Sequence, residues 1–213
     1  MTDLNPRPNG HQDGLGTESD PLVLQRWKLL DWRFLLPNPQ PRTVGFGGAM
    51  DSGMEEALRL LDPGAVRIGM EDGAARQLFE MVLLSEPDAR LFKAGAEAVQ
   101  PGGWLCVRIR RSFRIRSGPR TLLGWQRSLK RRGFQEVSVQ WYAPGLDLPS
   151  RIVPVGSRTA VLETLRRHEA IRFGKTKQFI GRVALDLGLF AAAIPEGVVT
   201  GQRGHTCMPV GEH

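Results

Sequence analysis

Three glycines and one carboxylate follow two apolar segments early in the chain, and these are the first residues whose spacing could support chemistry. Gly45, Gly47 and Gly48 lie in RTVGFGG, and Glu71 directly follows AVRIGM. In a nucleotide-binding α/β sheet, glycines after the first strand allow close backbone approach, and an acid after the second strand accepts two ribose hydroxyls. The same residues also fit a tight turn with an incidental surface glutamate. Both interpretations stay open from the residues alone.

Arginines gather further along the chain. Residues 105–132 contain ten basic and no acidic side chains, although the whole chain carries a net charge of only +7. Arginine suits bidentate contact with phosphate, so this stretch predicts an anionic ligand or RNA. A solvated loop and helix face is the alternative. The arginines concerned are Arg108, Arg110, Arg111, Arg114, Arg116 and Arg120.

The composition limits the cellular compartment and the kinds of site that we expect. The two cysteines, Cys106 and Cys207, form no disulfide framework and no metal motif. The N-terminus lacks the apolar core of a signal peptide, and no window approaches the length of a membrane helix. We therefore expect a protein of the reducing cytoplasm, with no metal site and no membrane span.

The elements that would position these residues centre on Phe79 to Ile109. An apolar strand at residues 81–84 is followed by a polar break, an amphipathic helix, a Pro-Gly-Gly turn and a second apolar strand at residues 104–109. Strand, crossover helix and strand form one βαβ unit and imply a parallel sheet.

A second such unit precedes it. We expect a strand at residues 42–48, a helix at 52–61 and a strand at 65–70. The few residues that follow are too few for an ordinary crossover, which needs a dozen or more. Either residues 81–84 form a strand after a short return, or residues 74–84 are themselves the crossover helix, because their apolar residues also recur at helical spacing.

The remaining segments give the expected domain organisation. Residues 1–21 should be a disordered tail, and residues 22–42 a helix ending near Asp31 and a proline-rich lead-in. Residues 43–143 should form the α/β domain, with a late helix at 121–132 and a strand at 134–141. Residues 144–213 should be a C-terminal extension with helices at 157–168 and 176–192, then a strand remnant and a frayed end. The predicted fold is a Rossmann-like, mostly parallel sheet with helices on both faces, shortened around the third strand.

Several phrases in this order resemble the class I S-adenosylmethionine-dependent methyltransferase family. They are RTVGFGGAM, VRIGMED, FEMVLL, AVQPGGWLCV and GFQEVSV, and together they cover about residues 42–143. The resemblance favours a strand at 81–84. It implies S-adenosylmethionine as cofactor, with Gly45, Gly47 and Gly48 around its methionine part and Glu71 on its ribose. The backbone of Leu84 and Ser85 would lie near its amino acid end.

The chain departs from that family pattern in two places. The loop offers Gly47, Ala49 and Asp51 where the family has glycines at every second position, and the third-strand region is compressed into residues 72–78. DWRFLLPNP and WYAPGLDLPSRIVPV also look loosely like methyltransferase-like domains of bacterial polysaccharide or secondary-metabolite gene sets.

Three functions follow as expectations. The first is methyl transfer to a small molecule or glycan precursor, with no catalytic base assigned. The second is a non-catalytic binding or partner subunit of the same fold, which the two departures favour. The third and weaker one is an RNA-binding or RNA-modifying protein. Tyr142, the only tyrosine, ends a late strand and is predicted to be a packing residue, with substrate contact as the alternative.

Overall fold

A single mixed sheet organises the part of the chain that the structure describes. The computed structural model describes residues 28–69, 77–110, 118–143, 146, 151–167, 174–194 and 196–204. The strands within these ranges form a seven-stranded sheet in the order β2-β1-β3-β4-β7-β5-β6. Their bounds are β1 Val44–Gly48, β2 Val66–Arg67, β3 Phe79–Ser85, β4 Val99–Arg110, β5 Phe134–Ala143, β6 Arg151–Pro154 and β7 Glu196–Arg203.

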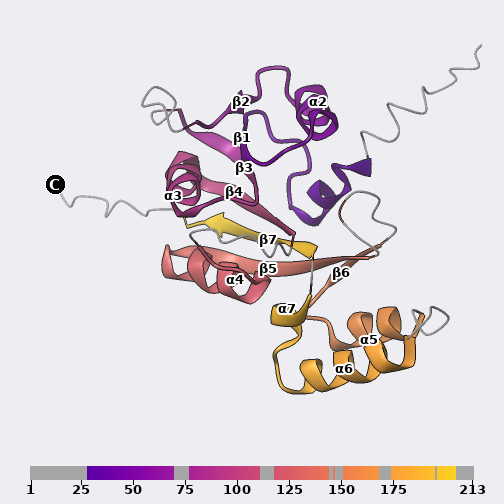
Figure 1. Cartoon of the computed structure of the whole chain (residues 1–213). Coiled ribbons are helices and arrows are strands. Elements are labelled where there is room, and N and C mark those ends of the chain that lie inside the picture. The colour runs from indigo at the N-terminus through magenta and orange to yellow at the C-terminus, as the bar shows by residue number, and fades with distance from the viewer. Residues whose placement is uncertain are drawn as a thin grey trace, which may run out of the picture.

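Three of the six pairings among the described strands are parallel, and five of these seven strands run in the same direction. β1 pairs with β2 and β3 in parallel, and β3 pairs with β4 in parallel. β7 runs antiparallel to both β4 and β5, so β5 has the direction of β4, and β6 returns antiparallel to β5 at the edge. Figure 1 shows β7, in yellow, between β4 and β5. The predicted Rossmann-like α/β class is confirmed.

Helices cover both faces, so each face of the central strands is buried. The 3₁₀ helix η1 (Asp31–Leu35) and α2 (Ser52–Leu61) adjoin one apolar cluster, which includes Leu30, Met54 and Leu58. The cluster on the other face takes side chains from α3 (Ala89–Ala98), α4 (Leu122–Arg131), α5 (Arg158–Arg167) and α7 (Phe190–Ala193). α6 (Gly174–Asp186) packs against α5 and α7. This two-sided burial explains the almost unbroken apolar sequence of β3.

Side chains at three helix starts satisfy backbone donors. Asp51 accepts a hydrogen bond from the Met54 amide at 2.7 Å and begins α2. Asp88 does the same for Leu91 at 2.8 Å in α3, and Thr121 for Gly124 at 3.1 Å in α4. Such caps hold each helix start in place directly after a strand or loop.

The first half of the chain confirms one of the two interpretations left open. Phe79–Ser85 is a strand, so the interpretation of residues 74–84 as a crossover helix is wrong. The predicted strand at residues 65–70 is shorter than expected, because only Val66–Arg67 pairs with β1. The Pro-Gly-Gly turn is a bulge inside β4. Phe79 pairs with Val99 but Met81 pairs with Trp104, so extra residues loop out between them.

The C-terminal part contains more of the sheet than the sequence predicted. The segment expected as a strand remnant is the full strand β7, and it lies in the interior of the sheet. The helix predicted at 176–192 is instead α6 and α7, separated at Gly188 with its φ of 67°. The tail at 1–21 and most of the helix predicted to start at 22 lie outside the described residues. No helix in the described ranges is long and apolar enough to span a membrane.

Candidate functional site

The strand order places the candidate site at the carboxyl ends of β1 and β3. The chain leaves β1 through α2 to reach β2 on one side, and it later returns to form β3 on the other side. In open α/β sheets, a ligand binds outside the carboxyl ends of the strands where the strand order reverses in this way. The carboxyl ends of β1, β3 and β4, with the described residues that follow β1 and β3, therefore surround the candidate site.

The ends of β1 and β3 are held together by backbone contact. Gly48 has a φ of 92°, and a Cβ at this position would lie 2.0 Å from the Ser85 carbonyl oxygen. The Ala49 amide donates to that same carbonyl at 2.9 Å. Only glycine can occupy position 48 in this arrangement. Ser85 itself is buried, and it forms the floor of the candidate site.

Gly45 and Gly47 lie within β1 rather than in the turn after it. A Cβ on Gly45 would meet Ile68 and Phe79 side-chain atoms at 2.9 Å, and one on Gly47 would meet Leu91 at 3.1 Å. Both glycines therefore make room for neighbouring side chains of the protein. All three glycines that the resemblance placed around the cofactor are part of β1, the bend begins at Ala49, and only Gly48 of the three lies at the carboxyl end of the strand.

A small charged cavity lies at the carboxyl ends of these strands. We call this end of the sheet the carboxyl edge, and the cavity the carboxyl-edge cavity. Its volume is about 50 Å³, and its walls combine two carboxylates, two guanidinium groups and the buried serine. The described residues that line it are Ala49, Asp51, Ser85, Glu86, Arg108, Arg110 and Leu146. Groups of both signs in one cavity suit a ligand that is itself zwitterionic, because each charge then meets its opposite.

Arg108 and Glu86 are brought together by the pairing of β3 with β4. Arg108 lies opposite Ser85 in the parallel ladder and is only 6% exposed. The Glu86 amide donates to the Arg108 carbonyl at 2.9 Å, and Glu86 has a φ of 47°. Positive φ is uncommon for a residue with a side chain. This conformation turns the chain sharply after β3 and keeps Glu86 beside the cavity.

Arg110 connects the wall of the carboxyl-edge cavity to β7. Its guanidinium lies 3.2 Å from a Glu196 carboxylate oxygen, and the two residues are opposite each other in the β4–β7 ladder. The other oxygen of Glu196 accepts the Leu146 amide at 2.8 Å. The strand that sequence reasoning underestimated therefore supplies the carboxylate that joins β4 to the segment after β5. Of the remaining predicted residues, Glu71, Arg111, Arg114 and Arg116 lie outside the described residues.

Two buried ionisable groups, Cys106 and Tyr142, belong to the apolar cluster that η1 and α2 adjoin. Burial raises the pKa of the Cys106 thiol far above its usual value, so the thiol stays neutral. Burial also raises the pKa of the Tyr142 phenol, and the positive charge of Arg108 partly opposes that rise. The Tyr142 hydroxyl has no hydrogen-bond partner among the described residues. Neither group is poised to ionise near neutral pH, and the described part of the chain contains no cluster of metal-ligating side chains.

Sequence reasoning missed Asp51 and Glu86 as site residues. Asp51 was noted only as a departure from the glycine pattern, and Glu86 only as part of a polar break. The available signal was their position, because each follows a strand that ends at the switch point.

Comparison with known proteins gives structural likenesses without sequence relatives. No family model matches the sequence, and no curated protein matches it. The structure is similar to a methyltransferase from Thermotoga maritima described as a possible histamine N-methyltransferase, at 14% identity over 85% of this chain and 91% of the other, with a TM-score of 0.41. It is also similar to the StiE O-methyltransferase domain, at 14% identity over 84% and 74% of the two chains, with a TM-score of 0.44.

A third similar structure is phosphoethanolamine N-methyltransferase 2 of Haemonchus contortus, solved with S-adenosylhomocysteine. The identity is 13% over 85% of this chain and 53% of that one, with a TM-score of 0.43. TM-scores below 0.5 at such low identity do not decide the function of this chain. The fold assignment therefore rests on the strand order of its own sheet.

Proposed function

We propose that this chain binds S-adenosylmethionine at the carboxyl edge of its sheet and transfers the methyl group to a small molecule or glycan precursor. One observation supports this most directly. At the switch point between β1 and β3, Asp51, Glu86 and Arg108 line one cavity beside the buried Ser85. The sequence resemblance to class I methyltransferases implies the same location, because it places Gly48 and the Ser85 backbone beside the cofactor.

The charges of the cavity fit the amino acid end of the cofactor. That end carries an ammonium and a carboxylate, and the cavity offers carboxylates for the first and guanidinium groups for the second. S-adenosylmethionine supplies a methyl group on a positively charged sulfur, and transfer leaves a neutral thioether. Asp51 and Glu86 would favour the charged cofactor over its product, because opposite charges attract most strongly in a partly desolvated site.

The predicted cofactor residues divide into two kinds. Gly48 and Ser85 hold the carboxyl ends of β1 and β3 together by backbone contact. They would contribute to cofactor binding by fixing the position of these strand ends. Gly45 and Gly47 would contribute indirectly, because they let β1 pack tightly against Ile68 and Leu91. Glu71 remains the proposed partner of the ribose hydroxyls, because it follows the neighbouring strand β2.

Calorimetry with S-adenosylhomocysteine tests the proposal directly. Wild-type protein should bind, and Glu71→Gln should weaken binding about tenfold through loss of charge-assisted hydrogen bonds to two hydroxyls. Glu56→Gln is the matched control, because Glu56 is an exposed glutamate on α2 and should leave the affinity unchanged. Equal loss in both variants, or no binding of either cofactor form at millimolar concentration, would contradict the proposal.

A non-catalytic subunit of the same fold is the second candidate, and the cavity volume favours it. The cavity measures about 50 Å³, whereas pockets for ligands of this size usually measure about 300–1,000 Å³. The glycines of β1 also serve internal packing. If neither S-adenosylmethionine nor its product binds a fully folded chain, this second function replaces the first.

A further inference from the structure

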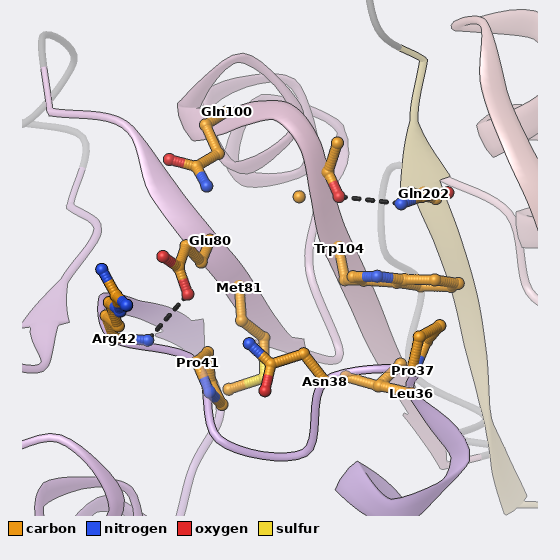
Figure 2. Close-up of a pocket in the computed structure, with 12 residues that line it drawn as sticks. Leu36, Pro37, Asn38, Pro41, Arg42, Glu80, Met81, Gln100, Trp104 and Gln202 are labelled. Atoms are coloured by element: carbon orange, nitrogen blue, oxygen red, sulfur yellow. Dashed lines mark hydrogen bonds between the residues drawn. The ribbon is translucent and has the colours of Figure 1, made fainter.

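A larger cavity lies at the opposite edge of the sheet, and no step of the proposed methyl transfer uses it. We call it the amino-edge cavity. It measures about 350 Å³, and it lies between the proline-rich lead-in, the first residues of β3, the bulge of β4 and the end of β7 (Figure 2). Its lining residues are Leu36, Pro37, Asn38, Pro41, Arg42, Glu80, Met81, Gln100, Gly102, Gly103, Trp104 and Gln202.

Hydrogen bonds hold the wall formed by the lead-in. The Arg42 amide donates to one carboxylate oxygen of Glu80 at 2.8 Å, and the Glu80 amide donates to the Thr43 hydroxyl at 3.0 Å. The lead-in is therefore fixed to β3 from both sides. A wall that is already ordered loses little conformational freedom when a ligand binds.

The bulge of β4 is fixed as firmly. The Gln202 side chain donates to the Gly102 carbonyl at 2.9 Å, and the Arg203 guanidinium donates to the carbonyls of Val99 and Glu97. Gly103 lies so close to β3 that a Cβ would be 2.9 Å from the Glu80 carbonyl oxygen. These contacts give the Pro-Gly-Gly phrase a defined shape, and they place Gln100 and Trp104 on either side of it.

Polar groups in the cavity remain available to a ligand. Within the described part of the chain, the Gln100 amide and the Trp104 indole N–H make no hydrogen bond to protein, and one oxygen of Glu80 accepts none. Asn38 uses its carbonyl oxygen for the Gln40 amide and keeps its NH₂ group. Figure 2 shows Asn38, Glu80 and Gln100 around one space, with Trp104 extending toward β7.

The chemistry of this set selects a neutral ligand rich in hydroxyl groups. Amides offer both a donor and an acceptor, and a carboxylate accepts, so together they match hydroxyls, which do both. Arg42 and Glu80 carry opposite charges, so the cavity does not favour a phosphate or a simple cation. Trp104 and Pro37 supply apolar surface for the C–H face of a sugar ring.

We infer that the amino-edge cavity binds a neutral saccharide unit through Glu80, Gln100 and Trp104. The inference does not depend on the proposed methyl transfer. The seven residues of β3 separate this cavity from the carboxyl edge, which corresponds to roughly 20 Å. A sugar bound here is therefore out of reach of the transferred methyl group. It would be the part by which a larger ligand or partner is held on the protein.

The test is titration of the full chain with D-glucose, N-acetyl-D-glucosamine and maltose, followed by calorimetry and ligand-observed NMR. At least one sugar should bind in the millimolar range. Gln100→Ala should weaken that binding about tenfold, because the variant loses the hydrogen bonds that the Gln100 amide would make to sugar hydroxyls. Gln135→Ala is the matched control, since Gln135 is exposed on β5, and the affinity should not change.

Two further ligands make the assignment falsifiable. Adenosine offers a flat base that could stack on Trp104, and choline offers a cation for Glu80. Binding of either one in preference to all three sugars would overturn the saccharide assignment. Sugar binding that Gln100→Ala leaves intact, or no sugar binding by either folded protein, would overturn it as well. Urea unfolding of Gln100→Ala provides the check that this variant is folded.

Discussion

The two ends of the sheet hold cavities that differ in volume and in the groups that line them. At the carboxyl edge, charged groups of both signs surround about 50 Å³, and backbone contact between Gly48 and Ser85 sets the floor. At the amino edge, amides, an indole and one charge of each sign from Arg42 and Glu80 surround about 350 Å³, and a bulge held by side-chain hydrogen bonds forms the wall. The strand order points to the first of these two cavities, whereas the second has the larger volume.

The difference shows that position in a fold and capacity for a ligand are separate properties. Ligands favour the carboxyl edge of a doubly wound sheet because adjacent crossovers diverge there. The amino edge has no such topological reason for a cavity. It acquires one from the lead-in before β1 and the extra residues in β4. A function argued for each edge therefore needs its own evidence.

The largest effect should come from adding one carbon at the carboxyl edge. Gly48→Ala would place a Cβ 2.0 Å from the Ser85 carbonyl oxygen in a residue with a φ of 92°. Because backbone atoms on both sides would have to move, we expect a loss of about 3 kcal/mol or more in the free energy of unfolding. Urea titration followed by circular dichroism measures this.

A variant of a second glycine separates the energetic cost of the steric clash from the cost of a positive φ. Gly133 has a φ of 81° after α4, and a Cβ there would meet nothing within 4 Å. Gly133→Ala should therefore cost only the left-handed conformation, about 1 kcal/mol. Equal losses in the two variants would show that the close contact between β1 and β3 does not hold the carboxyl edge together.

At the amino edge the corresponding change should cost less. Gly103→Ala would bring a Cβ to 2.9 Å from the Glu80 carbonyl oxygen and 3.0 Å from two further carbonyl oxygens. These contacts are longer than the 2.0 Å contact at position 48, and Gly103 has no positive φ, so we expect a smaller loss of about 2 kcal/mol and weaker sugar binding. Gly156→Ala, with open space around its Cβ, is the control and should be almost neutral. A neutral Gly103→Ala would contradict a rigid wall.

Much of the parallel half of the sheet could be predicted from sequence. FEMVLL is a nearly unbroken apolar run because β3 is buried on both faces, and SGMEEALRLL has helical spacing after the cap Asp51. Local pattern and resemblance together were enough to predict these elements.

The role of the glycines in β1 could not be predicted in this way. Close approach of backbone to a ligand and close approach of backbone to other protein atoms both require glycine, so the residue type cannot separate them.

The interior position of β7 could not be predicted in the same way. Its eight residues lie near the end of the chain, and its partners in β4 and β5 are more than fifty residues away. Nothing local states that Val199 should lie opposite Val107. The amino-edge cavity has the same origin, because Asn38, Gln100 and Gln202 come from three distant segments. Sites assembled by non-local pairing leave no motif.

A moderate effect should separate the two roles of Asp51. Asp51→Ala removes the cap of α2 and should cost about 1 kcal/mol of stability. Asp51→Asn keeps the cap, because asparagine is an equally good acceptor, but it removes the negative charge from the carboxyl-edge cavity. We therefore expect Asp51→Asn to retain stability and to bind S-adenosylmethionine several-fold more weakly. Unchanged affinity in a stable Asp51→Asn protein would exclude Asp51 from the cofactor site.

The smallest effect should come from the Tyr142 hydroxyl, which is buried without a partner among the described residues. Removing an unpaired polar atom leaves no donor behind, so Tyr142→Phe should leave stability unchanged or raise it by up to about 1 kcal/mol. Ser138→Ala is the contrasting variant. Its hydroxyl is hydrogen-bonded to Thr200 at 2.7 Å, so its loss should destabilise the protein. If Tyr142→Phe is stable yet weakens cofactor binding, the hydroxyl acts at the carboxyl edge near Arg108, and the packing role predicted for Tyr142 is incomplete.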